Sequence, residues 1–248
     1  MLRNTRTFFP SEGDVTIMKF AFGLAAVSGL LLATPALAED YNWTGPYIGA
    51  HIGGAWGNTT VRDNAKDGVA PGPFSYDTSG VFGGATAGYN YQIGNIVMGV
   101  EGDAGYLDLS GSGIIGSTHA DHHQDITTSG GAYGDLTGRL GWAWNNLLLY
   151  GKGGILVFDG EALQATTADG YAPHGADGFI GWTAGGGVEY ALTQKISLKI
   201  EYLHMDFGAG DGSQTAIVAD PPTPAGYAFK NSHDVTADTV KLGVAYHF

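Results

Sequence analysis

The side chains best suited to bind a metal ion fall in one short polar segment. It holds His119, Asp121, His122, His123 and Asp125. Imidazole and carboxylate groups at close spacing are ligands for zinc and copper. Because adjacent histidines on a polar loop do not form a preorganised ligand set, we assign no metal site and expect an exposed loop. Weak binding of zinc, copper or haem by these residues is the alternative.

The sequence offers little for catalysis. Serine, histidine and aspartate are mainly scattered through loop-like segments, without the pattern of a nucleophile elbow. A phosphate loop and an HExxH motif are missing, and the absence of cysteine excludes thiol chemistry and disulfides. We therefore expect a protein that is not an enzyme and carries no cofactor.

Eight charged residues form a second chemical set, because they share one side of alternating segments. The acids are Glu101, Asp103, Glu189 and Glu201, and the bases are Arg139, Lys152, Lys199 and Lys241. Four acids thus match four bases. The elements that would position them must place alternate residues on opposite faces, which is the property of a β-strand.

The period-two pattern recurs along most of the chain. At the C-terminus Val240, Leu242, Val244, Tyr246 and Phe248 alternate with Thr239, Lys241, Gly243, Ala245 and His247. The same alternation predicts eight strands, over 46–57, 81–92, 96–106, 136–144, 147–158, 182–192, 196–203 and 239–248. Most of these reach the length of about 9–11 residues that a tilted strand needs to cross a bilayer.

The connections between these strands alternate between short and long. Tight turns are expected at 93–95, 145–146 and 193–194, and long polar segments at 58–80, 110–130, 159–178 and 208–235. This asymmetry is typical of outer-membrane barrels. We predict an all-β fold, an eight-stranded antiparallel transmembrane β-barrel in an up-and-down meander, with short periplasmic turns and long extracellular loops.

The interior of an eight-stranded barrel is only wide enough for side chains to fill it. The eight charged residues face this interior, so we expect a salt-bridge network that fills the lumen. A polar channel lining is the alternative, since inward glycines leave some room for water. Aromatic residues near strand ends predict two interfacial girdles: Trp43, Trp56, Tyr89, Tyr91, Trp142, Trp144, Tyr190, Tyr202, Tyr246 and Phe248.

The N-terminal region reads as an export signal. Lys19 precedes an apolar run over 20–33, and Ala36-Leu37-Ala38 fits a cleavage site. We therefore divide the chain into 1–38, an extension plus a removable signal peptide, and 39–248, a barrel domain. Met18 is a better start than Met1, and both remain open.

The expected mature chain is strongly acidic. Residues 39–248 contain 8 basic and 22 acidic residues, a net charge of −14. Because nucleic-acid binding requires basic patches, we expect no nucleic-acid partner.

Several segments resemble the porin-family small outer-membrane β-barrel proteins of alphaproteobacteria, with the architecture of outer membrane protein A. They are 43–49 (WTGPYIG), 83–90 (GGATAGYN), 99–101 (GVE), 138–141 (GRLG), 181–190 (GWTAGGGVEY), 199–202 (KIEY) and 246–248 (YHF). The resemblance implies an abundant structural component and surface antigen of the outer membrane of Gram-negative cells. It also implies that Phe248 is the C-terminal signal for the barrel-insertion machinery.

These observations together predict a structural outer-membrane protein that supports envelope integrity and surface contacts. A narrow porin-like channel for small solutes is one alternative, and a surface binding protein, an adhesin or a haem or metal receptor, is another. As partners we expect outer-membrane lipid, lipopolysaccharide and the insertion machinery. A monomer is favoured.

Overall fold

The computed structural model describes residues 41–63, 73–116, 123–166, 171–172, 174–216 and 228–248. The predicted signal segment 1–38 and three metal candidates, His119, Asp121 and His122, lie outside these residues. His123 begins a strand. Across the described part of the chain, no helix has the length and apolarity needed to span a membrane.

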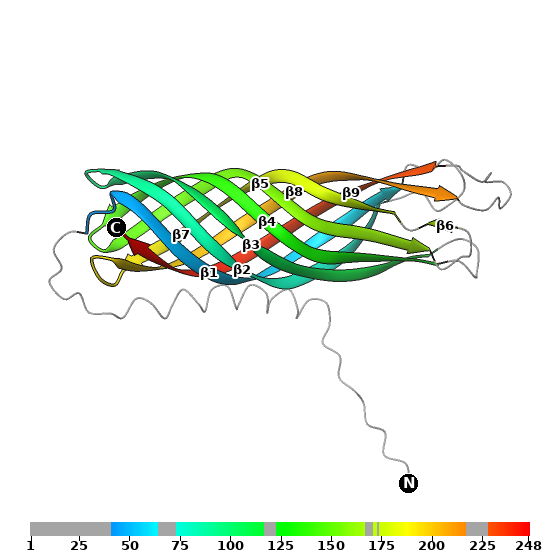
Figure 1. Cartoon of the computed structure of the whole chain (residues 1–248), viewed down its shortest axis with the longest axis horizontal. Coiled ribbons are helices and arrows are strands. Elements are labelled where there is room, and N and C mark those ends of the chain that lie inside the picture. Colours follow the sequence, from blue (N-terminus) through cyan, green and yellow to red (C-terminus); the bar gives the residue numbers. More distant parts are fainter. Residues whose placement is uncertain (1–40, 64–72, 117–122, 167–170, 173, 217–227) are drawn as a thin grey trace, which may run out of the picture. The chain divides into compact units, whose positions relative to one another are not determined.

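Eight long strands form one closed antiparallel barrel (Figure 1). They are β1 (Gly45–Asp63), β2 (Pro73–Ile93), β3 (Ile96–Gly116), β4 (His123–Trp144), β5 (Leu147–Thr166), β7 (His174–Ala191), β8 (Ile196–Ala216) and β9 (Ala228–His247). The two-residue β6 (Tyr171–Ala172) pairs with β8. Each long strand pairs with the next in sequence, and β1 pairs with β9, with Tyr47 opposite His247. The predicted fold class is confirmed.

Alternating side chains explain why these segments form a barrel. On β4, Leu140 and Trp144 point outward and are 63% and 71% exposed. Arg139, which precedes Leu140, points into the barrel and is buried. On β9, Leu242 and Val244 face outward, and Lys241 faces the lumen. The outward apolar side chains match the hydrocarbon of a bilayer, and closure of the barrel pairs the edge strands that lipid would leave unsatisfied.

Tight turns join the strands at the end that carries the C-terminus (Figure 1). Gly94 and Asn145 adopt positive φ angles of 59° and 51°, as two-residue hairpins require. The side-chain amides of Asn95 and Asn146 donate to the carbonyl oxygens of Ala143 and Ala191, at 2.9 and 3.0 Å. Each asparagine thus links its own turn to the neighbouring hairpin.

The strands extend further toward the opposite end than predicted. Much of the four segments expected to be long loops is paired strand: for example, Thr59 pairs with Tyr76, and Gly113 with Ile126. The outward positions there become polar, as at Asp77, and so the apolar alternation ends while backbone pairing continues. The predicted boundaries were wrong because apolar alternation reports contact with lipid, whereas hydrogen bonding extends beyond it.

One predicted girdle residue belongs to the interior instead. Trp43 is fully buried, and its ring lies 4.6 Å from that of Tyr41. The backbone N–H of Trp43 donates to Gln92 Oε1 at 2.8 Å, which ties the segment before β1 to the end of β2. Of the other predicted girdle residues, seven are clearly exposed: Tyr89, Tyr91, Trp142, Trp144, Tyr202, Tyr246 and Phe248.

Candidate functional site

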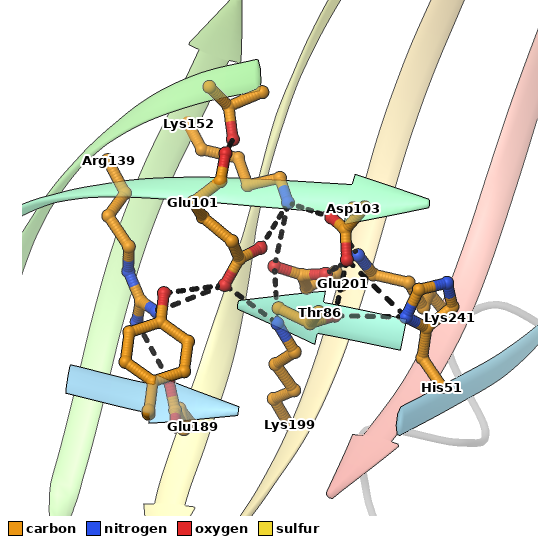
Figure 2. Close-up of polar contacts among 12 residues, drawn as sticks. His51, Thr86, Glu101, Asp103, Arg139, Lys152, Glu189, Lys199, Glu201 and Lys241 are labelled. Carbon is orange, nitrogen blue, oxygen red and sulfur yellow. Dashed lines mark hydrogen bonds and ion pairs between the residues drawn. The ribbon is translucent and has the colours of Figure 1, made fainter. Parts of the chain in front are cut away.

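The structure brings the eight charged residues together in one layer inside the barrel (Figure 2). They come from six strands: β3 carries Glu101 and Asp103, β4 Arg139, β5 Lys152, β7 Glu189, β8 Lys199 and Glu201, and β9 Lys241. All eight are buried. We call this set the charged layer.

Glu101 occupies the centre of the charged layer. Its Oε1 accepts from Lys152 Nζ at 2.5 Å, and its Oε2 accepts from Lys199 Nζ at 2.8 Å. Arg139 Nη1 lies 3.4 Å from the same Oε2, and the Tyr47 hydroxyl donates to it at 2.8 Å. One carboxylate therefore connects strands β1, β4, β5 and β8 to β3. Such charge-assisted hydrogen bonds compensate the desolvation of a buried carboxylate.

Lysines also link two further carboxylates, those of Asp103 and Glu201. Lys241 Nζ lies 2.5 Å from Glu201 Oε2 and 2.9 Å from Asp103 Oδ2. Lys152 Nζ lies 3.1 Å from Asp103 Oδ2 and 3.5 Å from Glu201 Oε1. Each of these lysines bridges two or three acids, so the layer is a connected network rather than a set of isolated pairs.

Arg139 is held by both charge and aromatic rings. Its Nη2 donates to Glu189 Oε2 at 2.7 Å. The guanidinium carbon lies 4.1 Å from the ring centroid of Tyr150 and 5.6 Å from that of Tyr47. Stacking of a guanidinium on aromatic faces adds attraction in a desolvated site.

Further polar side chains that the sequence reasoning did not assign complete the layer. His51 contacts Thr86 Oγ1 at 3.0 Å and the Tyr133 hydroxyl at 2.5 Å, and Thr86 donates to Asp103. Ser197 donates to Glu189 at 2.6 Å. Each of these residues occupies an inward position of the alternating pattern, and this position is the signal that could have identified them. Polar residues of this kind are equally common at outward loop positions, so the signal is weak.

Asp135 stands apart from the paired acids. It lies opposite Asp103 in register on β4, and its side chain is buried. Both carboxylate oxygens lack a hydrogen-bond partner among the described residues. The described lumen therefore holds one acid beyond the predicted four, and the balance of four acids and four bases is incomplete.

Apolar layers lie on both sides of the charged layer. Toward the turn end, one cluster comprises Tyr41, Trp43, Val97, Ala143, Leu148, Tyr150 and Ala191. Toward the other end, a larger one comprises Ala55, Phe82, Leu107, Leu109, Tyr133, Leu156, Phe158, Phe179, Leu203, Met205, Phe207, Val235 and Ala237. Alternation alone did not predict them, because it marks inward positions without saying whether they are polar.

The inward glycines give room to long side chains. A Cβ at Gly88 would meet the Tyr47 ring at 2.4 Å, and one at Gly243 would meet Lys199 at 3.0 Å. At Gly187 it would meet Glu201 at 2.8 Å. These glycines let Tyr47, Lys199 and Glu201 reach across the lumen.

The chemistry of this site is electrostatic cross-linking. The layer joins carboxylates and cations from most strands of the barrel in a low-dielectric interior. Among the residues the structure describes, no three histidine or acidic side chains are grouped so as to hold a metal ion.

A closed barrel with lipid-facing side chains outside and a charged interior defines an outer-membrane β-barrel protein. The solved structure of the outer membrane protein OprG from Pseudomonas aeruginosa is similar in fold, with a TM-score of 0.52 at 15% identity, covering 84% of this chain and 98% of OprG.

The chain belongs to the outer membrane protein beta-barrel domain family, whose model matches residues 22–248. It is 32% identical over 186 residues to the 31 kDa outer-membrane immunogenic protein of Brucella melitensis, covering 71% of this chain and 75% of that protein. It is 31% identical over 206 residues to the 22 kDa outer membrane protein of Rhizobium leguminosarum, covering 82% and 79%. These relatives confirm the predicted family and place the protein in the outer membrane.

Proposed function

We propose that this protein is a structural component of the outer membrane whose barrel is closed to solute flow. One observation carries the proposal: the charged layer and the two apolar clusters fill successive levels of the lumen. An eight-stranded barrel has little interior beyond what its side chains occupy. Its roles are then envelope integrity and contacts made by the cell-surface end.

The relatives are consistent with this function. The Brucella protein is described as an outer-membrane immunogenic protein, a name that refers to no transported solute and no reaction. The described lumen gives no reason to assign an enzymatic role, since its carboxylates, apart from Asp135, are engaged by cations or hydroxyl groups.

Conductance tests the closed lumen directly. The refolded protein is inserted into planar bilayers beside a general porin as a positive control. We expect no sustained current from this protein under conditions in which the porin conducts. Stable open-channel steps that scale with the amount of inserted protein would contradict the proposal and favour a narrow diffusion channel.

Envelope integrity is tested in cells. Deletion of the gene should raise sensitivity to detergent and bile salts, and expression of the wild-type protein should restore resistance. If the deletion leaves the envelope intact and abolishes only adhesion or ligand uptake, the protein is a surface binding protein instead.

A further inference from the structure

The outer surface of the barrel carries an apolar groove on the face formed by β9, β1, β2 and β3. Its volume is about 810 Å³, and its lining includes Ile48, Ala50, Ala85, Ala87, Ala104 and Val244. This size falls within the range of about 300–1,000 Å³ that small-molecule sites occupy.

The groove arises because small residues lie side by side on neighbouring strands. Ala50 pairs with Ala85, which pairs with Ala104, and one step away Ala87 pairs with Gly102. Larger exposed side chains flank these small residues along their own strands: Ile48 and Ile52 flank Ala50 on β1, and Val100 and Tyr106 flank Gly102 and Ala104 on β3. The surface is therefore hollow between these larger side chains.

One end of the groove reaches the rim at which the tight turns lie. Ile196, the first residue of β8, and Tyr246, near the C-terminus, both line it. From there the groove runs toward the middle of the strands, to Ala85 and Ala104. Because the tight turns are periplasmic in this fold, the groove lies in the periplasmic leaflet, where the lipid is phospholipid.

A cation stands at that end. Lys195 Nζ lies 5.7 Å from the centroid of the Tyr246 ring, and the side chain is exposed. Of the basic residues whose side chains the structure describes, the other four, Arg139, Lys152, Lys199 and Lys241, belong to the charged layer. Lys195 is thus the one basic side chain of this set on the outside of the barrel. It sits at the headgroup end of an apolar groove in an otherwise acidic protein.

We infer that this groove binds a phospholipid of the periplasmic leaflet, with an acyl chain along Ala50, Ala85 and Ala104 and the phosphate beside Lys195. The groove also borders Thr86 and Asp103, but both side chains are buried toward the lumen, so the outward lining is apolar and suits an acyl chain. The position of Lys195 supplies the complementary charge for an anionic headgroup. The hollow gives an acyl chain more van der Waals contact than a flat, branched wall offers.

Native mass spectrometry of the barrel, extracted in mild detergent and supplied with phosphatidylglycerol, tests the inference. The wild type should retain one phospholipid. The double variant Ala85→Leu, Ala104→Leu fills the groove from the lipid side and should bind about tenfold more weakly. Lys195→Ala should bind about fivefold more weakly, and Lys195→Arg should restore binding.

The matched control is Ala184→Leu on β7, which faces outward on the opposite side of the barrel and should leave lipid retention unchanged. Slower gel migration after boiling verifies that each variant is folded. If the double variant does not fold, the comparison of Lys195→Ala with Lys195→Arg still tests the inference. Equal lipid retention by the wild type and Lys195→Ala would overturn the inference. So would a wild-type dimer without bound lipid, if the double variant that fills the groove no longer forms this dimer.

Discussion

At the scale of single residues, Arg139 provides the sharpest test of the filled lumen. Arg139→Ala leaves Glu189 buried without its cation, and breaking a buried pair costs about 3–5 kcal/mol. The lipid-facing control Leu140→Ala should cost less, because its lost contacts are exchanged for lipid. Urea unfolding in lipid vesicles measures both variants. An Arg139→Ala cost within error of zero would indicate a solvated, open lumen.

A pair of glycine variants tests whether long side chains cross the lumen as the structure has them. Gly88→Ala places a methyl group against the Tyr47 ring and should cost about 1–3 kcal/mol by overpacking. Gly138→Ala on β4 meets nothing within 4 Å, and its cost should stay within about 0.5 kcal/mol. Equal unfolding free energies for the two variants would contradict the placement of Tyr47.

The alternation in the sequence places eight charged residues on the inward face, but it omits Asp135 and does not predict what each charged residue contacts. The period-two pattern places Glu101 and Arg139 on the same face of the barrel wall. It does not predict that Glu189 is the closest partner of Arg139, because that contact depends on strand register and tilt. Asp135 was missed because it lies just before the predicted strand 136–144. The burial of Trp43 was missed because a residue that precedes a strand has no place in the alternating pattern.

At the scale of the elements, the turns are better determined than the far ends of the strands. Gly94 and Asn145 are residue types that accept a positive φ angle, and the sequence shows them between two apolar runs. The strand ends beyond the bilayer lack such a signal, because polar side chains such as Asp77 occupy their outward face. Side chains still contact one another inside the barrel there, since the hydroxyl groups of Tyr76 and Thr128 lie 2.7 Å apart. The register is irregular between Leu107 and Gly111.

The turn at Asn145 yields a prediction about the β4–β5 hairpin. Asn145→Val forces a β-branched residue into the left-handed region and should cost about 1–2 kcal/mol. Asn145→Gly accepts this conformation, and its unfolding free energy should remain close to that of the wild type. The comparison is made by urea unfolding in vesicles, and a valine variant as stable as the glycine variant would show that this turn is not strained.

At the scale of the whole molecule, the location of the charges predicts the response to salt. The ion pairs of the charged layer are buried, so mobile ions do not screen them as they screen exposed pairs. Raising NaCl from about 0.05 to about 0.5 M should change the unfolding free energy by less than about 1 kcal/mol. A loss of several kcal/mol over this range would mean that electrolyte enters the lumen.

Export predicts where the mature chain begins. Cleavage after Ala38 would release a protein that starts at Glu39, only a few residues before Trp43 enters the barrel interior. N-terminal sequencing of protein extracted from the envelope checks this position. Recovery of residues 1–38 on the mature protein would contradict it.

The pairing of β1 with β9 sets a condition on biogenesis. Gly45 begins the first strand and His247 ends the last, so the seam can form only after nearly the whole chain is present. Until then both edges expose unpaired N–H and C=O groups, which the bilayer cannot satisfy. A chain that stops before β9 has no stable state in lipid, however well its other hairpins form. The seam thus acts as a check on synthesis: a truncated product stays open and remains available to periplasmic proteases, whereas a finished one closes.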